Sequence, residues 1–280
     1  MAFDEAKKDF NLIGTRPARP DGIDKVTGRA QFGADKAAPG QLHAAILRSP
    51  HAHALIKSID TSAAEKAKGV KGIVTRADFA TGLKGEMWNK LENVMAGEKA
   101  LYDGHAIAAV AATSALAAKD ALKLIKVDFE VLDHVTNVDE SMKDGAPVIR
   151  EGAAGPGTPE GMHPNVVGFY SSGHGDVDAG FADADLVIED TFTTEATHQG
   201  YIEPHACLAQ MGKDGKGEVW CCTQGHFNVA KVCGHLLGTE ASQIRVTASE
   251  IGGGFGGKTE VFIEPVALAL AKKTNRPVKL

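Results

Sequence analysis

The 280-residue sequence has no cluster of lysine and arginine, and its formal net charge is −6. Binding to nucleic acid or to an anionic membrane surface needs a cationic face, so neither partner is expected. Long apolar runs are also absent, since the longest, AIAAVAA at 106–112, is too short to span a bilayer. The charged start, MAFDEAKKDFNLIG, lacks the apolar region of a signal peptide, which predicts a cytoplasmic location.

Cysteine is scarce, and its spacing contains neither a C-x-x-C pair nor an iron–sulfur pattern. The four cysteines are Cys207, Cys221, Cys222 and Cys233. A disulfide scaffold is therefore not expected, and these residues are interpreted as small buried hydrophobic side chains. Four histidines and one cysteine could suggest a zinc site, but their spacing in the sequence matches no structural zinc pattern, so such a site is disfavoured. They are His51, His53, His198, His205 and Cys207.

Short strands and helices alternate in the first half of the chain. Apolar periodicity predicts strands at 42–49, 54–60, 69–78, 105–112 and 126–132, and helices at 61–68 and 114–125. In the last of these strands Val127, Phe129 and Val131 alternate with charged residues, which is typical of a half-buried strand. The pattern predicts a mixed α+β domain.

Residues 141–165 are rich in glycine and proline and have no sustained period, which predicts an inter-domain linker. Beyond them, strands are predicted at 186–197, 216–224 and 243–249, and helices at 228–238 and 264–274. Gly238 is expected to end the first helix, and Pro265 suits the first turn of the second. The predicted organisation is a domain at 1–140, a linker at 141–165 and a domain at 166–280.

Glycine is abundant, and five of the 32 glycines surround Phe255 in SEIGGGFGGKTEVFIEP at 249–265. Gly252 to Thr259 have the spelling of a phosphate loop, G-x-x-x-x-G-K-T, and also contain the dinucleotide pattern G-x-G-x-x-G. A phosphate loop needs an acidic magnesium ligand further along the chain, and a dinucleotide site needs an acidic residue there for the ribose hydroxyls. Only 21 residues follow Thr259, and they hold one helix and a basic end. The glycines are therefore interpreted as letting the backbone approach something flat or bulky.

Six motifs occur in one order along the chain. They are IDKVTGRAQFGAD, ILRSPHAHALIKSIDTSAA, DALKLIKVDFEVL, YIEPH, WCCTQ and GGGFGGK. Together they resemble the molybdenum-binding subunit of the xanthine dehydrogenase and aldehyde oxidase family, the molybdenum hydroxylases, from about Gly14 to Leu280. The resemblance implies an α/β hammerhead-like domain followed by the first part of an α+β molybdopterin-binding domain.

The resemblance also implies a molybdenum-dependent oxidoreductase that hydroxylates an electron-poor carbon with oxygen from water. Its cofactor would be a molybdenum–pterin group, with the cytidine dinucleotide form open, and no side chain would bind the metal directly. Iron–sulfur and FAD groups would lie on partner subunits. Purine substrates are in doubt because Lys258 is followed by Thr259, where purine-oxidising members have glutamate. Aldehydes, N-heterocycles and aromatic thioesters remain open.

Residue by residue, Gln224 matches the glutamine that hydrogen-bonds an oxo ligand of the metal. A neutral amide can donate to such a group without changing the charge of the site. The cofactor-binding loop corresponds to Gly253, Gly254, Phe255, Gly256 and Gly257. The resemblance places Gln224 and Phe255 near the metal, and it assigns Phe255, Thr259 and Glu260 to the substrate pocket. Glu203 is a further catalytic candidate.

Each assignment has a plainer alternative. Gln224 could be a polar strand-end residue bonded to backbone, Phe255 could pack in a core, and Glu203 could be a solvated carboxylate or part of a buried ion pair. The general-base glutamate of the family and much of its cofactor cage have no counterpart in these 280 residues. The chain is therefore expected to be inactive alone and to need a complementary molybdenum-binding polypeptide. A non-catalytic interaction piece of the same complex and a nucleotide-binding module remain as alternative functions.

Overall fold

The computed structural model describes residues 10–152 and 158–280. Its helices are α1 (Gly22–Val26), α2 (Ser62–Glu65), α3 (Gly85–Val94), α4 (Ala115–Leu122), α5 (Val138–Ser141), α6 (Val177–Ala182), α7 (His226–Leu237) and α8 (Glu264–Thr274). Its strands are β1 (Leu42–Arg48), β2 (Ala54–Asp60), β3 (Val70–Thr75), β4 (Lys99–Ala100), β5 (Ala106–Ala112), β6 (Lys126–Val131), β7 (Cys207–Met211), β8 (Gly217–Cys221), β9 (Ile244–Ala248) and β10 (Val278–Lys279). Short 3₁₀ turns occupy Gly33–Asp35, Arg76–Asp78 and Ala241–Gln243. None of the described helices combines the length and apolar character needed to cross a membrane.

The main sheet has seven strands in the order β3-β5-β1-β10-β7-β8-β9. Strands β3, β5 and β1 pair antiparallel, while β8 and β9 run parallel. The two-residue β10 lies between β1 and β7 and pairs with both. Strands from before and after residues 141–165 therefore share one sheet. The predicted domain boundaries at 140 and 166 stay predictions.

Strand β5 is at the centre of the core, and all seven of its residues are buried. Ala109 and Ala111 belong to the large apolar cluster that includes residues of α7 and α8, whereas Ala108 and Val110 belong to a smaller cluster with residues of α2 and α4. A strand covered on both faces has little room for polar side chains. The prediction of a buried strand at 105–112 is thus confirmed.

A second, three-stranded sheet has the order β4-β2-β6. In β6 the alternation is confirmed for Val127 and Phe129, which pack against a small buried cluster. It is wrong for Val131, whose residue is 62% exposed. The apolar cluster beneath β6 ends at Phe129, so alternation in the sequence extends further than the core that would bury it.

The helix predictions hold with small shifts of their ends. Helix α4 begins after Ser114, whose side chain accepts a hydrogen bond from the Ala117 N–H at 3.1 Å, as an N-cap residue does. It ends at Leu122 rather than 125. Helix α7 ends at Gly238, which adopts a left-handed φ of 70°, and α8 covers the predicted 264–274 with Pro265 in its first turn.

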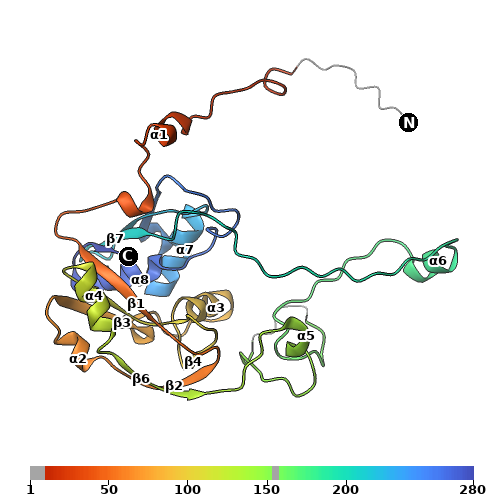
Figure 1. Cartoon of the computed structure of the whole chain (residues 1–280), viewed down its shortest axis with the longest axis horizontal. Helices are drawn as coiled ribbons and strands as arrows, with labels where there is room; N and C mark the ends of the chain where they lie inside the picture. The colour runs from red at the N-terminus through yellow and green to blue at the C-terminus, as the bar shows by residue number, and fades with distance from the viewer. Residues whose placement is uncertain (1–9, 153–157) are drawn as a thin grey trace.

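The strand predicted at 186–197 is wrong, because these residues form no ladder in the structure and are exposed throughout. A strand needs a neighbour to take its backbone hydrogen bonds, and the described chain supplies none here. Figure 1 shows this segment and α6 extending far from the body of the molecule. Sequence reasoning also missed α1, α3, α5, α6, β4, β7 and β10.

The four cysteines are free thiols and are buried, as predicted. Burial raises the pKa of the thiols of Cys207, Cys221, Cys222 and Cys233. They therefore stay protonated near neutral pH and act as small apolar side chains in the core.

Candidate active site

The candidate site lies at the carboxyl ends of β8 and β9. Because these strands are parallel, the loops that follow them meet at one edge of the sheet, each leading into a helix, α7 or α8. Two hydrogen bonds hold the second loop to the first loop and to α7: Gln224 N donates to Lys258 O at 2.9 Å, and the side-chain Nδ2 of Asn228 donates to Thr259 O at 3.1 Å. This edge is where open α/β sheets bind ligands.

The side chain of Gln224 has a fixed orientation. Its Oε1 accepts hydrogen bonds from the backbone N–H groups of Gly256 at 3.1 Å and of Lys258 at 3.2 Å. Because both neighbours are donors, the oxygen must face them and the Nε2 must point the other way. The residue is exposed, and no described group accepts a hydrogen bond from Nε2. The plainer alternative is thus half right: the oxygen is bonded to backbone, while the nitrogen is available to a ligand.

Close approach explains the glycines of the loop. A Cβ on Gly254 would lie 2.5 Å from Cδ of Gln224, and one on Gly252 would lie 2.5 Å from Cβ of Glu203. A Cβ on Gly257 would lie 2.8 Å from a side-chain carbon of a neighbouring residue. Contacts below 3.0 Å are not tolerated, so any other residue would push the loop away from Gln224. The predicted close backbone approach is present, directed at side chains of this chain.

Phe255 projects from the tip of the loop. Its residue is 72% exposed, so the core-packing alternative is wrong. Its backbone has a φ of 50°, a left-handed conformation that costs a non-glycine residue about 1–2 kcal/mol. Gly253 and Gly256, on either side, also have positive φ values, of 98° and 87°. The loop therefore holds the aromatic ring outward, where it can contact a group outside this chain.

Beneath the loop, Glu203 and Lys258 form a buried ion pair. Lys258 Nζ lies 2.8 Å from Glu203 Oε2, and the two side chains are 0% and 9% exposed. Glu203 Oε2 also accepts from the Gly252 N–H at 2.7 Å, and its Oε1 accepts from the Gly33 N–H at 3.3 Å. The lysine of the phosphate-loop spelling is thus enclosed by protein and cannot reach a phosphate, which argues against nucleotide binding.

The two remaining predicted pocket residues lie beside the loop and are exposed. The Thr259 hydroxyl donates to Gly256 O at 2.9 Å, which tightens the turn. Glu260 forms an ion pair with Lys90 of α3. A substrate that contacted Glu260 would therefore meet a carboxylate whose charge is already balanced.

Sequence reasoning missed a cluster of aromatic residues next to the ion pair. Tyr201 and His205 are hydrogen-bonded at 3.1 Å, the ring of His205 lies 4.6 Å from that of Phe262, and Lys258 Nζ lies 4.9 Å from the ring of Tyr201. Burial lowers the pKa of His205, so the ring is neutral at physiological pH. Its Nδ1 is buried without a partner. The signal was present in YIEPH, where Tyr201, Glu203 and His205 alternate as on one face of an extended segment.

These groups fit an anionic, partly flat ligand. An outward amide N–H, the glycine N–H groups that have no partner within the described chain and an exposed aromatic ring offer donors and a stacking surface. The described residues contain no group of three or more His, Cys, Asp or Glu that could hold a metal ion.

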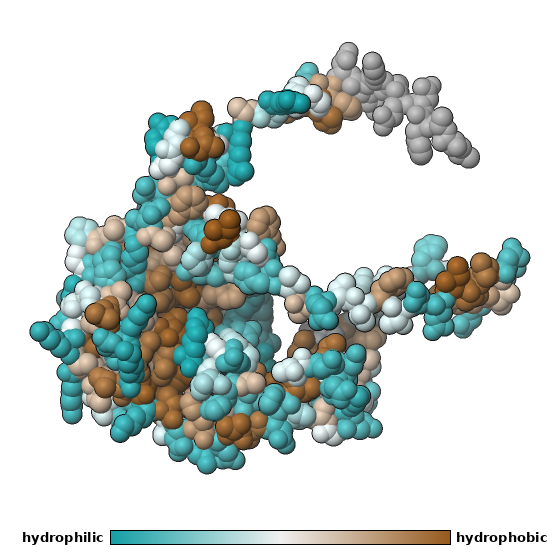
Figure 2. All heavy atoms as spheres, in the orientation of Figure 1, coloured by the Kyte–Doolittle hydropathy of each residue, from teal (hydrophilic) through white to brown (hydrophobic). Residues whose placement is uncertain are grey.

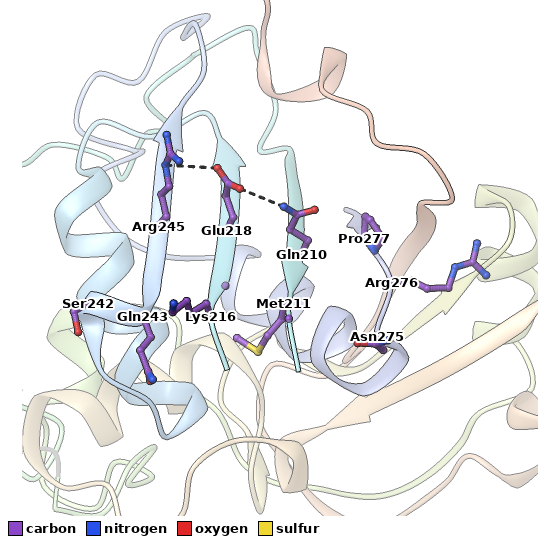
Figure 3. A pocket seen from close by; sticks show the side chains of 12 residues that line it. Gln210, Met211, Lys216, Glu218, Ser242, Gln243, Arg245, Asn275, Arg276 and Pro277 are labelled. Atoms are coloured by element: carbon purple, nitrogen blue, oxygen red, sulfur yellow. Dashed lines mark hydrogen bonds and ion pairs between the residues drawn. The ribbon is translucent and has the colours of Figure 1, made fainter. Parts of the chain in front are cut away.

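A separate cavity of about 540 Å³ lies at the opposite, amino ends of β8 and β9. Figure 3 shows Gln210, Glu218 and Arg245 in a row across β7, β8 and β9 on its wall. Gln210 Nε2 donates to Glu218 Oε2 at 3.2 Å, and Arg245 Nε lies 3.6 Å from Glu218 Oε1. None of the predicted site residues lines this cavity.

Two family models match the chain. Residues 27–133 match the aldehyde oxidase and xanthine dehydrogenase a/b hammerhead domain, and residues 159–280 match the molybdopterin cofactor-binding domain. The expected order, a hammerhead domain followed by a molybdopterin-binding domain in an α+β chain, is confirmed.

Three relatives of known name are similar over nearly the whole chain. The probable hypoxanthine oxidase of Escherichia coli K12 is 31% identical, over 97% of this chain and 32% of its own length. The nicotinate dehydrogenase large molybdopterin subunit of Eubacterium barkeri is 30% identical, over 98% of this chain and 62% of its own. The carbon monoxide dehydrogenase large chain of Afipia carboxidovorans is 31% identical, over 95% of this chain and 34% of its own length. The chain thus spans about a third of two of these relatives.

Two solved structures of named oxidoreductases are similar to this chain in fold. Quinoline 2-oxidoreductase from Pseudomonas putida 86 has a TM-score of 0.79 at 27% identity, with 95% of this chain and 34% of that chain covered. The aldehyde oxidoreductase from Desulfovibrio desulfuricans has a TM-score of 0.81 at 27% identity, with 95% of this chain and 30% of that chain covered.

Proposed function

The chain belongs to the xanthine dehydrogenase and aldehyde oxidase family of molybdenum enzymes, and from this premise we propose that it is part of a hydroxylase acting on an electron-poor carbon. The substrate class is an aldehyde, an N-heterocycle or an aromatic thioester, and the oxygen introduced comes from water. The observation that carries the proposal is the Gln224 amide, which two loop N–H groups hold with its nitrogen outward.

A molybdenum–pterin cofactor, when bound, supplies the oxygen transfer and accepts the two electrons of the oxidation. The Nε2 of Gln224 donates a hydrogen bond to an oxygen of that group and keeps it in one position without adding charge. The N–H groups of Gly253 and Gly254 have no described hydrogen-bond partner and suit an anionic neighbour, whereas those of Gly256 and Gly257 are bonded within the chain. The cytidine dinucleotide form of the cofactor remains open.

Phe255 excludes water from one side of the substrate and presents a flat surface to a planar ring. Thr259 and Glu260 border the same opening. Glu203, a catalytic candidate from the sequence, is buried against Lys258 at 2.8 Å. We therefore assign it to support of the loop from below rather than to contact with substrate.

We propose that the general base and the rest of the cofactor cage come from a complementary molybdenum-binding polypeptide, which carries the part of the longer relatives that these 280 residues do not match. Iron–sulfur and FAD subunits carry the electrons away. The chain alone is then inactive, and the complex lies in the cytoplasm.

The test is metal and cofactor analysis of the complex that this chain forms in its own host, purified through a tag on the chain. About one molybdenum per chain is expected, with iron and FAD in companion subunits. Turnover in ¹⁸O-labelled water should place the label in the product. An intact complex without molybdenum, or hydroxylation by the purified 280-residue chain alone, would contradict the proposal.

A matched pair of glycine variants sharpens this test. In Gly254→Ala the new methyl group would lie 2.5 Å from Gln224, so the amide must turn and molybdenum content should fall several-fold. In Gly22→Ala the nearest atom is 3.5 Å away, an ordinary contact, so metal content should match the wild type. Equal metal content and equal activity in both variants would contradict the role of the amide.

A further inference from the structure

Residues 168–197, here called the acidic arm, have no described hydrogen bond or ring contact to the body of the molecule. Every residue from 168 to 197 is exposed. The large apolar side chains among them are Phe169, Tyr170, Val177, Phe181, Leu186, Val187, Ile188 and Phe192. Figure 2 shows hydrophobic atoms gathered at the far end of the arm, where Figure 1 places α6. Exposed apolar side chains in such number mark a surface that another polypeptide covers.

The sequence of the arm encodes a strand that has no partner. LVIEDTFTTEAT at 186–197 is rich in β-branched and aromatic residues, which favour strands. In an extended chain Leu186, Ile188 and Phe192 fall on one face together with Asp190, because alternate residues share a face. These three side chains are 75%, 82% and 87% exposed. A segment with a strand sequence, an apolar face and an unpaired backbone is suited to adding itself to the edge of another sheet.

The charge of the arm limits what that other sheet can be. It contains seven acids, one histidine (His174) and no lysine or arginine; the acids are Asp176, Asp178, Asp183, Asp185, Glu189, Asp190 and Glu195. Two such arms would repel each other, so a second copy of this chain is a poor partner for it. The complementary surface must combine a free strand edge, an apolar face and basic side chains.

We propose that residues 186–197 add as a strand to the complementary molybdenum-binding polypeptide, whose lysine and arginine side chains face the carboxylates of the arm. The inference rests on the proposed function, because the occupant is the portion of the subunit that this chain lacks. Its relatives of about three times the length supply that portion in the same chain. The arm ends six residues before Glu203, whose carboxylate accepts a hydrogen bond from the Gly252 N–H of the glycine loop, so the same partner reaches the edge where Gln224 and Phe255 lie.

Hydrogen–deuterium exchange of the complex purified from the host, compared with the full 280-residue chain, tests the strand. Amides of 186–197 should exchange about a hundredfold or more slowly in the complex, because only a ladder hydrogen bond protects them. Carbodiimide, which joins carboxylates directly to amines, should link Glu189 or Asp190 to lysines of the complementary polypeptide. That polypeptide is recognised by mass spectrometry as carrying the remaining part of the same family of domains.

Variants test the apolar face. Ile188→Asp with Phe192→Asp should weaken recovery of the complementary polypeptide by about tenfold or more, whereas Leu116→Asp, at a 70% exposed position on α4, should not. Both variants should leave the melting temperature of the isolated chain unchanged, because neither touches its core. A lower melting temperature for the arm variant would mean that the arm packs on its own chain and would overturn the proposal.

The outcomes separate this proposal from the function it rests on. A complex without molybdenum and without a complementary polypeptide would remove the proposed function. A molybdenum-containing complex in which 186–197 exchanges as fast as in the free chain would leave that function standing and overturn the arm proposal. Carbodiimide links between two copies of this chain would overturn it as well.

Discussion

At the scale of single residues, the carboxylate of Glu203 connects three parts of the chain. It binds the Lys258 ammonium, the Gly252 N–H and the Gly33 N–H, all within 3.3 Å. Lys258 in turn contributes its N–H to the oxygen of Gln224 and its carbonyl to the backbone of that residue. The orientation of the Gln224 amide thus depends on an ion pair that never touches a ligand.

Removing one charge of this pair should be costly. Glu203→Gln leaves a buried ammonium without a counter-charge, and Lys258→Met leaves a buried carboxylate, so each should destabilise the chain by about 3–5 kcal/mol. The double variant removes both charges and should recover a large part of the loss. Urea unfolding of the wild type, the two single variants and the double variant measures these changes in the free energy of unfolding. Single variants as stable as the wild type would show that the pair adds nothing to stability.

The resemblance of short motifs was enough to single out Gln224, Phe255 and the glycines as candidates, because each of them lies inside a motif that is recognised locally, and their roles stay predictions. It could not predict the burial of Lys258. The partner of that residue, Glu203, is 55 positions away, and the local spelling GGGFGGKT equally suits a lysine that reaches a phosphate. Only the tertiary contact distinguishes the two.

At the scale of elements, the sequence predicted the strands and helices whose own residues show a clear apolar periodicity. It missed β10 and β4, which are two residues long and exist only because their neighbours pair with them. The opposite error occurred at 186–197, where the local preference for a strand is strong and the neighbour is missing. Propensity describes what a segment can do, and pairing decides whether it does it.

The loop before β5 supplies a pH-dependent contribution to stability. His105 is buried, its Nδ1 accepts from Leu101 N at 3.1 Å, and its Nε2 lies 2.7 Å from Glu92 O. Burial is the main cause that lowers the pKa of His105 to about 4, and the charges of Arg150 and Arg48 lower it further. The ring is therefore neutral in the folded chain.

Between about pH 6.5 and pH 4 the unfolded chain takes up a proton at this histidine and the folded chain does not. Stability from this residue is complete above pH 6.5 and falls as the pH decreases, by about 3 kcal/mol at pH 4. His105→Gln should remove this part of the dependence. Urea unfolding of both proteins at several pH values checks it, and parallel curves for wild type and variant would contradict the assignment.

At the scale of the whole molecule, one short strand joins two halves of the main sheet. Val278 of β10 is fully buried and pairs with Leu42 on one side and Ala209 on the other. The backbone of Leu280 exchanges two hydrogen bonds with Cys207, at 2.8 and 2.9 Å. The hydrogen-bonded ladder on either side of β10 is short, and the halves are also joined through the large apolar cluster, which contains buried residues of both.

Val278→Asp places a carboxylate at a buried position of β10, between β1 and β7, and should destabilise the chain by about 3 kcal/mol or more. Because the large apolar cluster also joins the halves, both should still unfold together, at a lower urea concentration. Trp88 on α3 and Trp220 on β8 report on the halves separately when the other tryptophan is replaced by phenylalanine. Leu116→Asp, at an exposed position, is the matched control. An unchanged midpoint would contradict the contribution of β10 to stability.

The position of β10 in the sequence also sets an order of events during synthesis. About 230 residues separate the end of β1 from the start of β10. At roughly 5–20 residues per second, a ribosome needs on the order of 10 to 45 s to make them. During that time β1, β3 and β5 can pair while one edge of β1 stays open, and an open strand edge invites pairing with other chains. A ribosome that stalls before residue 278 would leave a nascent chain with a formed half-sheet and a persistent site for aggregation.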